Sequence, residues 1–101
     1  MEFSVISHPH RLDISVSGQF TFAYNHKFKQ IMALIENEPL ESLAINISGV
    51  DFIDSAGLGM LLLLRDRCLE KKIAISLHGA QGQVEKILAL SKFDQLFKTA
   101  P

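Results

Sequence analysis

The chain has 101 residues, of which 48 % are hydrophobic and 21 % are charged. These proportions are typical of one folded soluble domain and exclude a disordered or collagen-like chain. Ten Lys and Arg residues against eleven Asp and Glu residues give a net charge of −1, which argues against a basic surface for nucleic acid.

Two strands are expected at the start of the chain. Residues 11–17 strictly alternate apolar and polar side chains, which is the period of a half-buried strand. Residues 3–7 form a weaker strand, and His8-Pro9-His10 is the turn between the two. Strands joined so closely should pair as an antiparallel hairpin. Gly18 then interrupts the pattern.

Helices and strands alternate after the hairpin. Tyr24, Phe28, Ile31 and Ile35 recur at helical spacing, and Thr21 is the expected N-cap of that helix. Period and end signals predict helices at residues 22–36, 55–71 and 83–92, strands at residues 43–48 and 73–78, and a short closing strand at residues 96–98. The inner stripe of the last helix should consist of Val84, Ile87, Leu88 and Ser91.

This order of elements predicts an α/β fold with an N-terminal β-hairpin followed by βαβαβα. The strands that are joined through helices should lie parallel. Strands 43–48 and 73–78 are apolar on one side only, so we expect the helices mainly on one face of a mixed sheet. No linker or internal repeat divides the chain, and residues 1–101 are expected to form a single domain.

The segment between the third strand and the second helix, residues 49–59, concentrates the residues that can carry a function. Asp54 and Ser55 fall where the helix begins, and both are natural capping residues. Gly57 and Gly59 remove side chains from the first helical turns, which allows a close approach of another backbone. The carboxyl end of a strand is also where α/β sheets usually carry their sites. Local chemistry alone leaves open whether these residues only cap and pack the helix.

The run Phe52-Ile-Asp-Ser-Ala-Gly-Leu-Gly59, between an alternating strand and a Leu-rich helix, resembles the signature of STAS domains. These are the anti-sigma-factor-antagonist domains of bacterial partner-switching systems. Residues 84–97 resemble the last helix and closing segment of that family, and the hairpin ending in Gly18 resembles its start. The resemblance covers essentially the whole chain and implies the STAS fold.

The resemblance also implies a phosphorylation site. In the family, the serine directly after the motif aspartate is phosphorylated by a partner that is both an anti-sigma factor and a serine kinase, and this serine corresponds to Ser55. Many relatives carry a second hydroxyl at the next position, where this chain has Ala56. Asp54 would orient the Ser55 hydroxyl or help to hold the magnesium ion of the kinase, and a serine phosphatase would reverse the modification.

Phosphorylation should change binding rather than folding. Residues 30–64 contain no Lys or Arg and five acids, namely Glu36, Glu38, Glu41, Asp51 and Asp54, so the surroundings of a phosphate on Ser55 are expected to be negative. Relatives often carry acids just after the hairpin glycine, whereas this chain has Gly18-Gln-Phe-Thr21. The candidate contact surface for the partner comprises Phe52, Leu58, Gln19, Phe20, Thr21 and Phe22, with Gly57 and Gly59 supporting the phosphorylation site.

Three other functions remain as alternatives. Ser55 and four histidines superficially allow a hydrolase, but Ile53 stands where a Gly-x-Ser-x-Gly elbow needs glycine, so we do not expect an enzyme. A response-regulator receiver would use Asp51 or Asp54, but it would begin strand-helix-strand instead of with a hairpin. A non-switching STAS subunit, bound to the ATPase of a lipid-transporting ABC complex, would keep the fold and lose the switch.

The remaining features favour a protein of the cytoplasm. The first ten residues lack the basic and apolar regions of a signal peptide, and the longest apolar run, residues 56–64, is too short to span a bilayer. Cys68 is the single cysteine, and no spacing of zinc ligands occurs. We therefore expect a monomer without metal or cofactor, without membrane insertion and without a nucleic-acid partner.

Overall fold

A hairpin opens the fold. In the computed structural model, which describes residues 1–37, 39–93 and 98–100, β1 (Glu2–His8) pairs antiparallel with β2 (Arg11–Phe20). The turn between them consists of Pro9 and His10, and His10 takes the left-handed conformation with φ 62°. The two strands are each longer than the alternation of the sequence predicts.

The rest of the chain alternates helices and strands, as the sequence predicts. The order is η1 (Phe22–Tyr24), α1 (Asn25–Asn37), β3 (Ser42–Ile53), α2 (Ser55–Glu70), β4 (Ala74–His78), α3 (Gly82–Leu90) and β5 (Lys98–Ala100). The sheet has the strand order β1-β2-β3-β4-β5, and β2, β3, β4 and β5 run parallel to one another. The α/β fold with a hairpin start is therefore confirmed.

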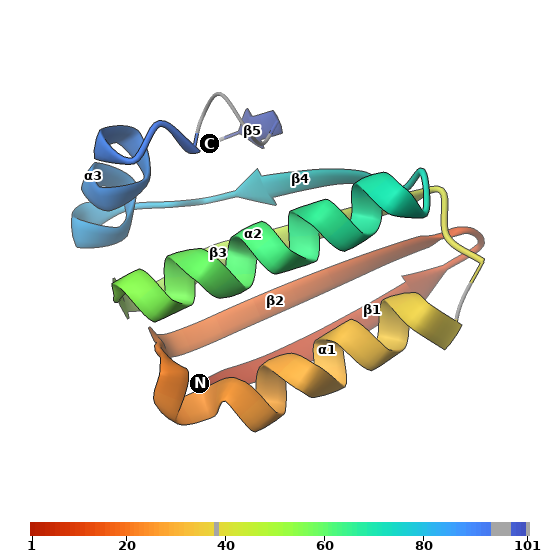
Figure 1. Cartoon of the computed structure of the whole chain (residues 1–101), viewed down its shortest axis with the longest axis horizontal. Helices are drawn as coiled ribbons and strands as arrows, with labels where there is room; N and C mark the ends of the chain where they lie inside the picture. Colours follow the sequence, from red (N-terminus) through yellow and green to blue (C-terminus); the bar gives the residue numbers. More distant parts are fainter. Residues whose placement is uncertain (38, 94–97, 101) are drawn as a thin grey trace.

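The helices α1 and α2 lie side by side over one face of the sheet (Figure 1). Side chains from both helices and from β2, β3 and β4 form one buried core. Within it the rings of Phe20 and Phe28 make an edge-to-face pair, with centroids 6.2 Å apart. The opposite face carries small and polar side chains because β2, β3 and β4 are apolar on one side only. The expected one-sided arrangement of helices is correct.

The main difference from the expected elements is the length of β3. The sequence predicts a strand that ends at residue 48, and the structure extends it to Ile53. The register between β2 and β3 shifts twice, and pairing resumes first at Ser17↔Gly49 and again at Gln19↔Phe52. Because β3 has an extra residue at each shift, its buried positions after Ile47 are Val50 and Ile53 instead of every second residue. Gly18 likewise interrupts the pattern without ending β2, since it has φ 86° and lies at one of these shifts.

The helix ends differ in smaller ways. Thr21 stands at the N-cap position of η1, but its side chain makes no capping hydrogen bond, and the α-helical part begins only at Asn25. Ser91 is exposed after the end of α3, so it does not belong to the inner stripe with Val84 and Leu88. Of the expected closing strand, Lys98 lies in β5, whereas residues 96 and 97 lie outside the described residues.

No helix in the described part of the chain combines the length and apolar character that crossing a membrane requires.

Candidate functional site

Asp54 connects β3 to α2 and caps the helix. Its backbone is extended, with φ −105° and ψ −179°, and its Oδ1 atom accepts a hydrogen bond of 2.7 Å from the backbone N–H of Gly57. The backbone carbonyl of Asp54 accepts a second bond from Leu58 at 3.0 Å. Asp54 thus satisfies one of the helix donors that would otherwise lack a partner.

Gly57 allows the first turn of α2 to lie directly against β2. A Cβ atom at this position would stand 2.2 Å from the carbonyl oxygen of Phe20 and 2.8 Å from Cγ1 of Ile53. A Cβ atom at Gly59, in contrast, would meet nothing within 4 Å. Close packing therefore explains the first glycine of the motif and does not explain the second.

Ser55 is the first residue of α2, and its side chain is exposed. It lies at the helix end where the free backbone N–H groups and the macrodipole favour a negative charge. The adjoining Ala56 offers no hydroxyl. The exposed position satisfies the first requirement for modification by another protein.

The candidate contact residues divide into exposed and buried positions. Phe22 and Phe52 are 66 % and 42 % exposed, Gln19 is exposed, and Thr21 and Leu58 are half-buried. Phe20 is 2 % exposed and packs on Phe28, so its assignment to a partner surface is wrong. Phe20 follows Leu12, Ile14 and Val16 at a period of two, so it faces the helices with them. The alternation of residues 11–17, continued past Gly18, is the sequence signal for its burial.

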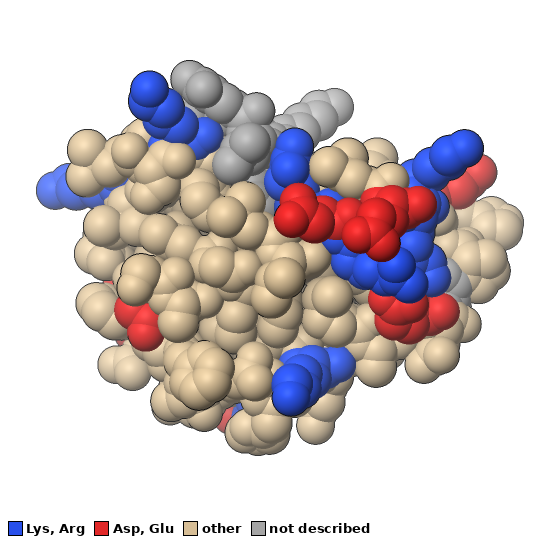
Figure 2. All heavy atoms as spheres, in the orientation of Figure 1, with Lys and Arg blue, Asp and Glu red and all other residues tan. Residues whose placement is uncertain are grey.

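The acids that the sequence places near Ser55 are mostly elsewhere in the fold. Asp51 and Asp54 adjoin Ser55 along the chain, but Glu36 forms a two-bonded ion pair with Arg67 near the far end of α2, and Glu41 precedes β3 at the opposite end of that strand. Glu38 lies outside the described residues. Figure 2 shows the charges gathered at one side of the helical face, with most of the remainder uncharged. Glu36 and Glu41 therefore do not contribute to the expected negative surroundings of Ser55, and Asp51 and Asp54 remain beside it along the chain.

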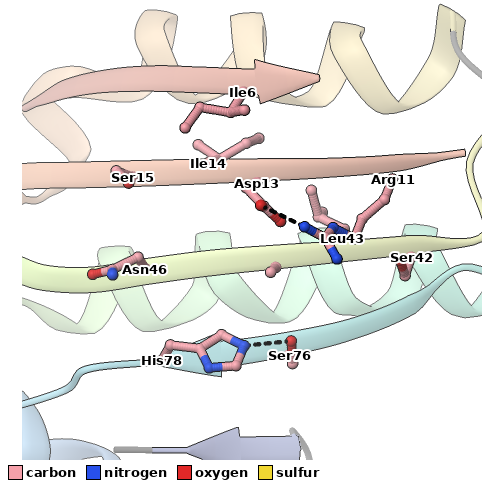
Figure 3. Close-up of a pocket in the computed structure, with 11 residues that line it drawn as sticks. Ile6, Arg11, Asp13, Ile14, Ser15, Ser42, Leu43, Asn46, Ser76 and His78 are labelled. Carbon is pink, nitrogen blue, oxygen red and sulfur yellow. Dashed lines mark hydrogen bonds and ion pairs between the residues drawn. The ribbon is translucent and has the colours of Figure 1, made fainter. Parts of the chain in front are cut away.

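The uncovered face of the sheet carries a hollow of about 650 Å³, which the predicted elements do not indicate (Figure 3). On one side Arg11 donates to Asp13 at 3.0 Å, and on the other Ser76 and His78 share a hydrogen bond of 2.8 Å. Short side chains such as Ser42 and Ala44 of β3 also line the hollow. The only sequence signal for this hollow is the outer row of small residues on β3 and β4. Among the described residues, no group of three or more His, Cys, Asp or Glu side chains could hold a metal ion.

Comparison with known proteins places this geometry in a family. The family model of the STAS domain matches residues 2–101. The chain belongs to the STAS domain family. A STAS-domain containing protein of Pseudomonas aeruginosa strain UCBPP-PA14 is 37 % identical to this STAS domain over 87 residues, which cover 86 % of this chain and 85 % of the relative. The resemblance recognised in the motif around Ser55 is thus confirmed.

Two solved structures show how widely this STAS fold is shared. A crystal structure of an anti-sigma factor antagonist from Mycobacterium paratuberculosis superimposes with a TM-score of 0.84 at 24 % identity, covering 99 % of this chain and 85 % of that one. A sulfate transporter family protein from Wolinella succinogenes gives a TM-score of 0.75 at 19 % identity, covering 92 % and 76 %. At these identities the likeness establishes the fold alone, so the function of this STAS domain is argued from its site.

Proposed function

We propose that this STAS domain is a phosphorylation-controlled partner-switching regulator. In its unphosphorylated form it binds an anti-sigma factor or a related serine kinase, and phosphorylation of Ser55 releases that partner. A serine phosphatase restores the binding form. The observation that carries the proposal is the exposed Ser55 hydroxyl at the start of α2, with the exposed rings of Phe22 and Phe52 at the same end of the sheet.

Electrostatics support release without unfolding. A phosphate adds about −1.5 to −2 charges at neutral pH, and the amino end of α2 stabilises it by about 0.3–1 kcal/mol. A partner carboxylate about 5 Å away is opposed by roughly 3 kcal/mol per unit charge at an effective dielectric constant near 20. That opposition weakens binding by about a hundredfold or more. The acids that oppose the phosphate on binding must belong to the partner, because Asp51 and Asp54 adjoin Ser55 in the free and the bound protein alike.

In this proposal the protein acts in the cytoplasm by binding a partner, and it is not an enzyme. The Asp54 carboxylate, which in a catalytic triad would orient a histidine beside the serine, accepts instead from the Gly57 N–H. Two of the histidines are engaged elsewhere, since His8 bonds Asp13 and His78 bonds Ser76. The alternative, a constitutive subunit on the ATPase of a lipid-transporting ABC complex, would use the same exposed surface without modification of Ser55.

Two measurements test the proposal. Mass spectrometry of the protein from its own cells should find phosphate on the peptide that contains Ser55. Ser55→Ala should then retain the partner, identified as an anti-sigma factor or serine kinase, while Ser55→Asp binds it about a hundredfold more weakly. Ser7→Asp is the matched charge control, because Ser7 is exposed on β1 near the hairpin turn, at the other end of the sheet. Equal affinities of Ser55→Ala and Ser55→Asp for a bound transporter ATPase would favour the alternative.

A further inference from the structure

One side chain of α3 holds the backbone just before the proposed phosphorylation site. The backbone N–H of Ile53 donates to Oε1 of Gln83 at 3.2 Å, and Nε2 of Gln83 donates to the backbone carbonyl of Ile53 at 3.2 Å. Both backbone groups of one residue are thus paired with a single amide. Ile53 is the last residue of β3, and Asp54 and Ser55 follow it directly.

The end of β3 needs such a partner because β4 is short. β3 and β4 pair from Ser42↔Ala74 to Asn46↔His78, and β3 continues for seven residues beyond that point. Along this extension, Nε2 of Gln81 donates to the carbonyl of Ser48 at 2.6 Å. Gln81 and Gln83 therefore take the place of a neighbouring strand in the described part of the chain. Figure 1 shows α3 at the same end of the sheet as the start of α2.

The contact continues from Ile53 into the first turn of α2. The carbonyl that Gln83 holds belongs to the peptide group between Ile53 and Asp54, and Asp54 then caps Gly57 at 2.7 Å. The Ile53 side chain is 3 % exposed and lies close to Gly57. Movement of the Ile53 backbone would therefore move the cap and, with it, the Ser55 hydroxyl.

We infer that Gln83 is a positioning residue for Ser55, through which α3 fixes the geometry in which the hydroxyl meets a kinase or a partner. This inference rests on the proposed function of Ser55. A planar amide suits this position because it offers one acceptor and one donor to the two backbone groups of Ile53. Gln83 is half-buried, so these bonds are partly protected from water.

The test compares Gln83→Leu, which keeps a side chain of similar volume and removes both bonds, with Gln81→Leu as the matched control. NMR-detected hydrogen exchange of the backbone amides is the first measurement, and it needs no partner. In Gln83→Leu the protection factor of the Ile53 amide should fall at least tenfold and that of Gly57 should fall with it, whereas amides of the β1–β2 hairpin keep their values. Gln81→Leu should leave the protection factors of the Ile53 and Gly57 amides unchanged. Unchanged protection of Ile53 in Gln83→Leu would overturn the inference.

A conservative variant separates positioning from general packing. In Gln83→Glu the carboxylate still accepts from the Ile53 N–H but repels the Ile53 carbonyl, and protonation restores a donor. The protection factor of Gly57 should therefore be low at pH 7 and recover at pH 4 in this variant alone. Equal protection at the two pH values would contradict the role of the second bond.

The functional measurement uses the partner that Ser55→Ala retains. Gln83→Leu should bind it about tenfold more weakly, and Gln81→Leu should bind it as the wild type does. Binding of Gln83→Leu within twofold of wild type would overturn the positioning role even if Ile53 exchanges faster. If Ser55→Ala and Ser55→Asp bind alike, the proposed function fails, and the exchange data still decide whether Gln83 holds Ile53.

Discussion

The Asp54 carboxylate accepts a hydrogen bond from the Gly57 N–H at 2.7 Å, and this bond closes the first turn of α2 at the residue that precedes Ser55. Asp54→Ala should lower the free energy of unfolding by about 1 kcal/mol, because one helix donor loses its acceptor. Asp54→Asn should remain close to wild type, since asparagine caps as well as aspartate. Urea unfolding followed by circular dichroism measures both.

The same pair of variants separates the two roles that the sequence leaves open for Asp54. If its charge helps to hold the magnesium ion of a kinase, Asp54→Asn should be stable and poorly phosphorylated at Ser55. Asp51→Ala is the control for stability, because Asp51 is exposed on β3 and should change unfolding by less than about 0.5 kcal/mol. An Asp54→Ala protein as stable as wild type would show that the cap contributes nothing.

The two motif glycines should respond in opposite ways to a methyl group. Gly57→Ala places Cβ 2.2 Å from the Phe20 carbonyl, and the required shift of backbone should cost about 1–3 kcal/mol. Gly59→Ala meets nothing within 4 Å and should stabilise α2 by up to about 1 kcal/mol, as alanine is the better helix former. The urea midpoints of the two variants should therefore lie on opposite sides of the wild-type value. Destabilisation by Gly59→Ala would show that open space around the new Cβ atom does not suffice for α2 to accept alanine at this position.

The general arrangement of the fold follows from patterns that are visible in the sequence. Strict alternation in residues 11–17 marks β2, and the one-sided apolar rows of β3 and β4 indicate that helices cover one face of the sheet. The position of Ser55 at the start of α2 follows equally from the change of period after Ile53. These features are local, and each depends on a period of two or 3.6 residues.

What the sequence does not predict depends on contacts between distant segments. The extension of β3 to Ile53 follows from two shifts in its register against β2, and neither strand shows these shifts alone. The separation of Glu36 from Ser55 depends on the direction in which α1 packs on α2. The bond between Gln83 and Ile53 spans thirty residues, and a lone glutamine near a helix start gives no reason to expect it.

The thiol of Cys68 should react slowly in the folded protein. Cys68 is 0 % exposed, and its burial raises the pKa of the thiol from 9.0 to about 11, against a smaller opposing effect of Lys71. At pH 8 this shift lowers the thiolate fraction by roughly a hundredfold. A chromogenic disulfide reagent should therefore label the native protein at least about a hundredfold more slowly than the urea-unfolded chain. Native labelling within tenfold of the unfolded rate would contradict the burial of this thiol.

The ion pair between Glu36 and Arg67 should make stability depend on pH in the acid range. Hydrogen bonding by the Arg67 guanidinium is the main cause that holds the pKa of the Glu36 carboxyl below its usual value of 4.5. The pair therefore stabilises the fold above the pKa of the unfolded chain, and this contribution is lost as the pH falls through the lowered pKa of the folded state. Glu36→Gln should be less stable than wild type at pH 7, and the two urea midpoints should converge as the pH falls below 4.5.

Salt provides the control for this pair. Both side chains are partly exposed at 38 %, so 1 M NaCl should reduce the difference between wild type and Glu36→Gln at pH 7. Glu2→Gln is the matched variant, because Glu2 pairs with Lys27 at 2.9 Å and its side chain is 80 % exposed. It should lose less stability than Glu36→Gln, because Lys27 makes one bond to Glu2 whereas Arg67 makes two to Glu36. A difference that persists unchanged from pH 7 to pH 3 would mean that Glu36 acts through packing and not through its charge.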